Sequence, residues 1–99
     1  MTIKTKSGFA CEISEKKIGS WNMVDLYTKI TKATKGNDLI EIMELTKELY
    51  VFTLGEDGYN ALVEHLKDED GVVSAEDLAK EFNAIMEIAN AKKLKPSQR

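Results

Sequence analysis

Hydrophobic residues are most concentrated in the stretch 38–52, where nine of fifteen positions are apolar and no glycine or proline occurs. Asn37 and Asp38 open this stretch and can cap a helix. At 100° per residue, the apolar side chains fall on two sides of that helix. One stripe comprises Leu39, Met43 and Tyr50 with Ile40 and Val51 at its edge, and the other comprises Ile42, Leu45, Leu49 and Phe52. A helix that is apolar on two sides is normally covered on both, so we expect a central helix with one face in the core and one against another chain.

Residues 2–13, at the start of the chain, alternate between polar and apolar side chains, which predicts a pair of β-strands. Ser7 and Gly8 lie between the two strands and predict a two-residue hairpin turn. The strand residues expected to face the core are Ile3, Phe9, Cys11 and Ile13. Because an isolated two-stranded ribbon is marginal in water, this hairpin must pack on helices or pair its edge with another copy.

Three further helices are predicted from apolar residues at i, i+3, i+4 and i+7. The first starts at a cap on Ser20 or Asn22 and ends near Gly36, which is available as a left-handed cap. The second follows a short break at residues 53–55, and the third starts at a cap on Ser74. Their apolar faces are Met23, Leu26, Tyr27 and Ile30; Tyr59, Leu62, Val63 and Leu66; and Leu78, Ala79, Phe82, Ile85, Met86 and Ala89.

These elements together predict an α+β fold that is mostly α, with an N-terminal β-hairpin packed on a bundle of about four helices. A chain of 99 residues has the usual size of one compact domain. We place this domain at residues 1–91. The segment 92–99 is basic and contains the single proline, so we expect it to be a frayed C-terminal tail.

The charge balance narrows the choice of partners. The chain has 14 basic and 17 acidic residues and a net charge of -3, which argues against nucleic acid as a partner. No stretch approaches the roughly 18 continuous apolar residues of a membrane span. The single cysteine, Cys11, excludes an intramolecular disulfide, and the N-terminus has no apolar run typical of a signal peptide, so a reduced cytoplasm fits best.

No pattern of residues supports catalysis or a bound cofactor. His65 is the single histidine, whereas a zinc site needs several His or Cys ligands. The six glycines are scattered singly, so no phosphate-binding loop is indicated. We therefore expect a non-enzymatic protein without a metal or cofactor.

The segment 68–77 is the sharpest local signal and gives an alternative function. It resembles the second half of an EF-hand calcium loop, with acids at Asp68, Asp70 and Asp77 and a turn glycine at Gly71. Counting back from that glycine, however, puts Leu66 where the loop needs its leading carboxylate. The alternative is a degenerate calcium-binding adaptor; the simpler interpretation is a connector between two helices.

The order of elements and several short segments resemble the small tail assembly chaperones of long-tailed bacteriophages. The segments that carry this resemblance are 8–13, 21–30, Leu54 with Gly55, and above all 64–73, which reads Glu-His-Leu-Lys-Asp-Glu-Asp-Gly-Val-Val. The resemblance covers nearly the whole chain and departs from the family at 34–37, which is more basic than the family pattern.

This resemblance implies a non-catalytic, oligomerising protein of the host bacterial cytoplasm that is not part of the mature virion. It would bind and solubilise the long tape measure protein until the tail tube forms around it. An amphipathic client helix laid in an apolar groove is the recognition mode that suits such a task. The residues we expect at this partner-binding or self-association surface are Trp21, Ile42, Leu45, Leu49, Phe52 and Ile88.

Overall fold

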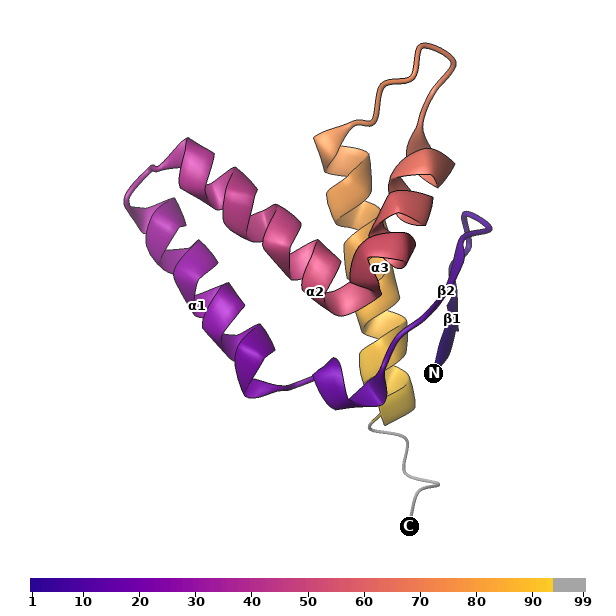
Figure 1. Cartoon of the computed structure of the whole chain (residues 1–99), viewed down its shortest axis with the longest axis horizontal. Coiled ribbons are helices and arrows are strands. Elements are labelled where there is room, and N and C mark those ends of the chain that lie inside the picture. Colours follow the sequence, from indigo (N-terminus) through magenta and orange to yellow (C-terminus); the bar gives the residue numbers. More distant parts are fainter. Residues whose placement is uncertain (94–99) are drawn as a thin grey trace.

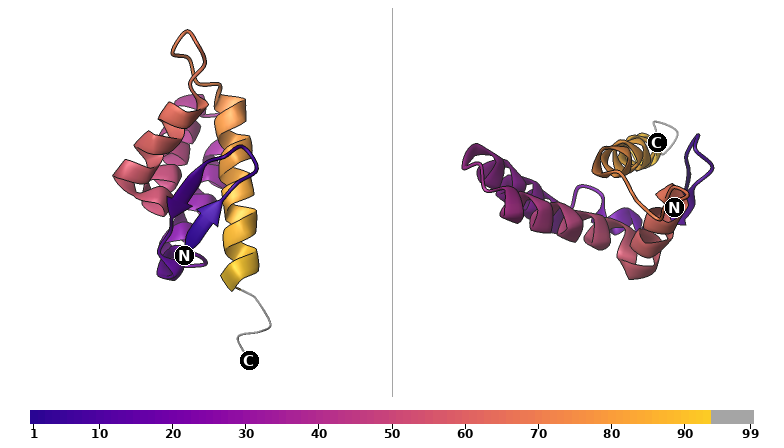
Figure 2. Two further views of the ribbon diagram at one scale, coloured as in Figure 1. Left: turned by 90° about the vertical axis from the view of Figure 1, so that its right-hand side faces the viewer. Right: turned by 90° about the horizontal axis from the view of Figure 1, so that it is seen from above.

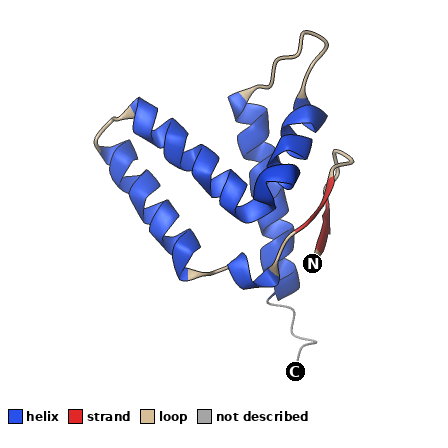
Figure 3. Ribbon diagram, in the orientation of Figure 1, coloured by secondary structure: helices blue, strands red, loops and turns tan. Residues whose placement is uncertain are grey.

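The computed structural model describes residues 1–93 and shows an α+β fold that is mostly helical, as the sequence predicts. Two short antiparallel strands come first, and helices account for most of the rest of the chain (Figures 1 and 3). In chain order the elements are β1 (Thr2–Lys4), β2 (Ala10–Glu12), the 3-10 helix η1 (Glu15–Lys17), α1 (Trp21–Lys35), α2 (Leu39–Leu66) and α3 (Ala75–Lys93).

The N-terminal hairpin has shorter strands and a longer loop than the sequence predicts. Ile3 pairs with Cys11 in the middle of the ladder. The connection therefore spans residues 5–9, closed by hydrogen bonds from the Thr5 amide to the Phe9 carbonyl and from the Gly8 amide to the Thr5 carbonyl. Gly8 has φ +95°, which explains why a glycine stands at this turn. The hairpin lies on α3 and the second half of α2, as Figure 2 shows.

Side-chain caps fix the starts of the three α-helices at the predicted residues. Ser20 Oγ accepts a hydrogen bond from the Met23 amide, Asp38 Oδ1 from the Glu41 amide and Ser74 Oγ from the Asp77 amide. The predicted left-handed cap at Gly36 is wrong. Gly36 is right-handed (φ -83°), and the positive φ falls one residue later, at Asn37, a residue type that tolerates this conformation.

Helix α2 is not straight, because Gly55 interrupts it with φ 79° and ψ 163°. Residues 39–54 run antiparallel to α1, and residues 56–66 turn back against α3 and the hairpin (Figure 1). We call α1 with residues 39–54 the arm, and the hairpin, η1, residues 56–66 and α3 the body. Seen from above, the arm extends from the body as a pair of helices one layer thick (Figure 2). In the thinnest direction of the molecule the Cα atoms span 19 Å.

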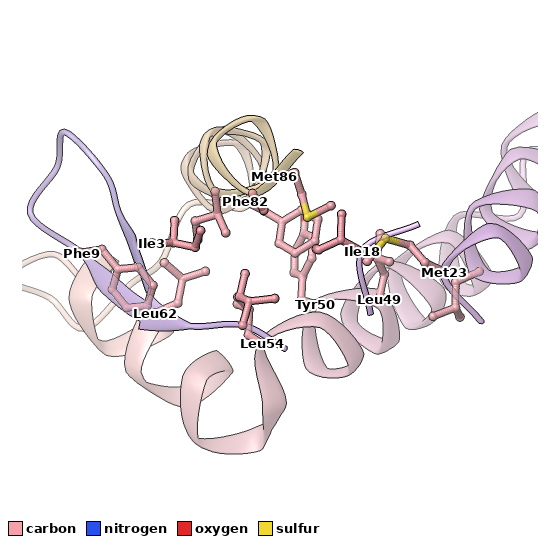
Figure 4. Close-up of a cluster of buried hydrophobic side chains, with 14 residues drawn as sticks. Ile3, Phe9, Ile18, Met23, Leu49, Tyr50, Leu54, Leu62, Phe82 and Met86 are labelled. Carbon is pink, nitrogen blue, oxygen red and sulfur yellow. The ribbon is translucent and has the colours of Figure 1, made fainter. Parts of the chain in front are cut away.

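One hydrophobic core joins the hairpin, both halves of α2, α3 and the base of the arm (Figure 4). Tyr50 and Phe82 stack with ring centroids 4.4 Å apart, which ties α2 to α3. Burying each large side chain is worth about 1.5–3 kcal/mol. The buried members are Ile3, Phe9, Ile13, Ile18, Met23, Leu26, Leu49, Tyr50, Leu54, Leu62, Phe82, Ile85, Met86 and Ala89.

The ordered domain extends beyond the predicted boundary at residue 91. Lys92 and Lys93 continue α3 and do not belong to a tail. Lys92 Nζ donates to the Thr2 carbonyl at 2.6 Å, and Lys93 Nζ donates to the carbonyls of Ile18 and Glu15. These contacts attach the end of α3 to β1 and η1. The remaining part of the predicted tail, 94–99, lies outside the described residues.

We expect Gly55→Ala to destabilise the protein by about 1 to 3 kcal/mol, because φ 79° with ψ 163° is open to almost no residue except glycine. A Cβ at this position would meet no heavy atom within 4 Å, so backbone strain alone sets the cost. Denaturant unfolding curves measure the difference.

Gly36→Ala is the matched control. Gly36 has a right-handed backbone, and a Cβ there would make ordinary contacts at 3.6 and 3.8 Å. This substitution should be neutral or should stabilise by up to about 1 kcal/mol. If Gly55→Ala were as stable as Gly36→Ala, the turn would not depend on a glycine backbone.

Candidate partner-binding cleft

A cleft of about 420 Å³ lies between the arm and α3. Most of its lining comes from the first half of α2 and the start of α3, two segments that diverge from each other in Figure 1. Tyr50 and Tyr59 come from the two halves of α2, and Leu78 comes from α3, so the turn at Gly55 brings these side chains together. Apart from one acid and one lysine, the lining residues are uncharged: Ile42, Met43, Glu44, Thr46, Lys47, Tyr50, Tyr59, Ala75 and Leu78.

The uncharged surface continues from the cleft onto α1. Burial raises the pKa of Tyr50, and the neighbouring phenols of Tyr27 and Tyr59 raise it further, so Tyr27 of α1 lies near the two tyrosines that line the cleft. Burial also raises the pKa of Tyr27, the member that comes from α1. Three threonines of α1 bond their hydroxyl groups to the helix's own carbonyls, at 2.8 to 2.9 Å, so these donors are already used: Thr28, Thr31 and Thr34. We call this side of the arm, together with the cleft, the uncharged face.

The opposite side of the arm is charged. Asp25 and Lys29 of α1 form an ion pair at 3.0 Å. The pKa of Lys29 is raised chiefly by Asp25 and additionally by Glu48 of α2, so the carboxylate of Glu48 is near this pair. A larger groove of about 750 Å³ adjoins the cleft along α2 and shares Glu44 and Lys47 with it, and four of its seven lining residues are charged: Glu41, Glu44, Leu45, Lys47, Glu48, Val51 and Phe52. The smaller cleft is the better site for an apolar partner, because fewer charges would lose water on binding.

The structure does not gather the six predicted partner-binding residues on one surface. Ile42 lies in the cleft, whereas Leu45 and Phe52 are half-buried and line the charged groove. Ile88 packs against the core from α3. Trp21 is 82% exposed at the start of α1 and is absent from both surfaces.

The prediction that Leu49 belongs to an exposed stripe is wrong. Leu49 is 4% exposed and lies beside Ile18 and Met23 in the core (Figure 4). The reason is that α1 packs on the stripe that contains Leu49. The other stripe of α2 is exposed only towards its N-terminal end, where Leu39 is 67%, Ile40 73% and Met43 63% exposed, whereas its member Tyr50 is buried.

Sequence reasoning missed two walls of the cleft, Tyr59 and Leu78. Both belong to helical faces that the sequence assigns to the core, and both do pack against it while remaining partly exposed. One sequence signal could have identified Tyr59 as part of a cleft. It is an aromatic residue at the edge of a core stripe, where one end of the side chain can stay in contact with solvent. Lys47 Nζ lies 6.0 Å from the centre of the Tyr59 ring, which places a cation at the rim.

A polar cluster joins the hairpin loop to the second half of α2 and to α3. Ser7 Oγ lies 3.1 Å from His65 Nε2 and donates to Glu81 Oε2 at 2.7 Å, and Thr5 donates to the same carboxylate. In a catalytic triad the acid orients the histidine, and the histidine takes the proton of the serine. Here the acid bonds to the serine itself. The cluster therefore anchors the loop and does not have the order of a triad.

The segment 68–77, which resembles a calcium loop in sequence, begins with a turn that is closed by hydrogen bonds within the turn itself. Asp68 Oδ1 accepts hydrogen bonds from the amides of Asp70 and Val72, both at 2.9 Å, and Gly71 supplies a positive φ of 78°. Among residues 1–93, no three His, Cys, Asp or Glu side chains come together as a metal site. The turn is explained by the Asp68 carboxylate and the glycine.

Comparisons with protein-family models, with curated proteins and with solved structures found no significant match to this chain. Within the described residues, no helix has the length and apolar character needed to cross a membrane. The cleft geometry and the sequence resemblance are therefore the observations on which a function must be based.

The buried phenol of Tyr50 predicts a loss of stability at alkaline pH. Its pKa is higher in the folded protein than the unfolded value of about 10, because burial disfavours the charged phenolate. The corresponding stability is complete below the unfolded pKa and is lost as the pH rises through the folded pKa. Unfolding curves between about pH 9 and pH 12 should show a steeper loss for the wild type than for Tyr50→Phe. Parallel losses in the two proteins would contradict this assignment.

Proposed function

We propose that this protein is a non-catalytic chaperone that binds an amphipathic helix of its client in the cleft between the arm and α3. The observation that supports this proposal most directly is the uncharged face, which includes the cleft and the exposed side chains of Leu39, Ile40 and Met43. A contiguous exposed apolar surface on a protein normally marks an interaction site. The larger groove along α2 is also concave, but four of its seven lining residues are charged, against two of nine in the cleft.

A helix is the partner that best fits the shape of the cleft. Two helices, the first half of α2 and the start of α3, form its walls, and tyrosines line it between them. A third helix laid between two others is the packing found in helical bundles and in helix-in-groove recognition. The wall that α2 contributes runs from Ile42 to Tyr50, about 13 Å at 1.5 Å per residue, so the cleft can support about two and a half turns of a client helix.

The chemistry of the cleft favours reversible binding to many different apolar segments. Met43 is a flexible side chain that can pack against different partners, and the tyrosines offer large apolar surface at a low entropic cost. The two charged lining residues, Glu44 and Lys47, have opposite signs and select little by net charge. A chaperone needs these properties, since it must cover many similar apolar segments and later release them.

The resemblance to phage tail assembly chaperones supplies the client. A tape measure protein is a long helical chain that cannot bury its apolar face before the tail tube exists, so it requires temporary cover. We propose that this protein covers it in the host cytoplasm and leaves before the virion is complete. The exposed apolar surface of the arm supports this choice of client. That surface is a feature of the structure and does not rest on the resemblance.

We expect this protein to raise the soluble fraction of the tape measure protein encoded in the same genome when the two are expressed together. Ala75→Glu should abolish this rescue, because it places a charge in the cleft at the first residue of α3. An acid in the first turn of a helix is favourable, so this variant should fold. The soluble fraction of the client is measured with each variant and without the chaperone.

Asn83→Glu is the matched control, with the same change of charge on the same helix at an exposed residue outside the cleft. It should rescue the client as the wild type does. A client that is equally soluble with and without this protein would refute the chaperone function, and rescue by Ala75→Glu would refute the cleft as the binding site.

A further inference from the structure

We propose that a second copy of this chain fills the cleft when no client is present. In this arrangement the arms of two copies lie antiparallel about a twofold axis, and the tip of each arm enters the other's cleft. Although the cleft is the one assigned above to a client helix, contact between two copies requires no client. The dimer would protect the uncharged face until a client replaces the second copy.

The first reason is that one helical segment, the first half of α2, supplies both the exposed tip and a wall of the cleft that the tip would enter. Leu39 and Ile40, at the tip of the arm, are exposed apolar side chains, with 67% and 73% of their surface accessible. The same helix, from Ile42 to Tyr50, forms one wall of the cleft. A surface that presents a projection and a matching hollow on one face is self-complementary, which a twofold contact requires.

The second reason is the charge of the cleft. Its two charged lining residues are Glu44 and Lys47, which differ in sign and stand three positions apart on α2. Two antiparallel copies with a twofold axis near residue 45 place Lys47 of each within one helical turn of Glu44 of the other. The same register places Ile40 of one copy beside Tyr50 of the other. Opposite charges therefore meet twice, and both apolar tips are covered.

The third reason is that the arm lacks a second layer of helices. A stable interface buries at least about 1,000 Å² in total. Because the twofold contact uses the tip and the cleft twice, each half needs to supply only about 500 Å². The arm is a single layer of two helices, and four helices in two layers form a complete bundle core. A second arm supplies that missing layer.

Sedimentation equilibrium of the chain alone tests this dimer. The wild type should be dimeric at tens of micromolar. Glu44→Lys and Lys47→Glu should each be monomeric under the same conditions, with the dimer dissociation constant raised by at least about 30-fold, the effect of one interface hot spot. An equimolar mixture of the two variants should form a heterodimer, because the acids of one chain then face the lysines of the other.

Two further variants keep the test informative if a charge reversal disturbs folding. Ile40→Asp changes a side chain that is 73% exposed and should also give a monomer. Trp21→Glu makes a similar change at an exposed residue outside the cleft and should leave the dimer intact.

A monomeric wild type, dimeric single variants or a mixture that stays monomeric would each overturn the proposal. Dissociation by Trp21→Glu with no effect of Ile40→Asp would place the dimer contact on another face and overturn it as well. None of these outcomes bears on rescue of the client, which is measured separately.

Discussion

The turn at Gly55 determines the rest of this structure. Without it, α2 would be a straight helix of 28 residues, about 42 Å long, with no means of contacting both α1 and the hairpin. A positive φ at one residue divides the helix into a segment that pairs with α1 and a segment that packs on α3 and the hairpin. The same turn leaves Tyr50 and Tyr59 facing one cleft.

The two parts of the molecule differ in how well they are covered. In the body, the hairpin and the helices enclose side chains such as Ile3, Leu62 and Ile85, which are fully buried, and Lys92 and Lys93 tie the end of α3 to the N-terminal region. The arm has one covered side, where α1 meets α2. Its uncharged face has no second layer within residues 1–93. This asymmetry connects the fold to the proposed chaperone function, since a stable body holds an incompletely covered arm in position.

Local features of the fold could be predicted from the sequence, because they depend on neighbours in the chain. The three helix caps at Ser20, Asp38 and Ser74, the apolar faces at i, i+3 and i+4, and the positive φ of Gly71 all belong to this class. The choice between the two stripes of α2 could not be predicted in this way. Both stripes are equally apolar, and the docking of α1 decides that Leu49 is buried.

The cleft was also beyond prediction, for a related reason. The periodicity correctly assigns Tyr59 and Leu78 to core-facing stripes, but their place at the rim of a cleft depends on the direction of the Gly55 turn. Lys92 and Lys93 were expected in a tail because the segment 92–99 is basic and contains the single proline. Their carbonyl partners on Thr2 and Ile18 come from the far end of the chain and leave no local signal.

Amide hydrogen exchange tests most directly whether the arm depends on an outside layer. In dilute protein alone, amides in the arm segment of α2, residues 39–54, should exchange faster than those around Ile85 and Ala89 in the middle of α3. Raising the protein concentration or adding the client should slow exchange in the arm and leave α3 unchanged. Equal protection of the arm and α3, independent of concentration and client, would show that the arm is complete by itself and would contradict this account.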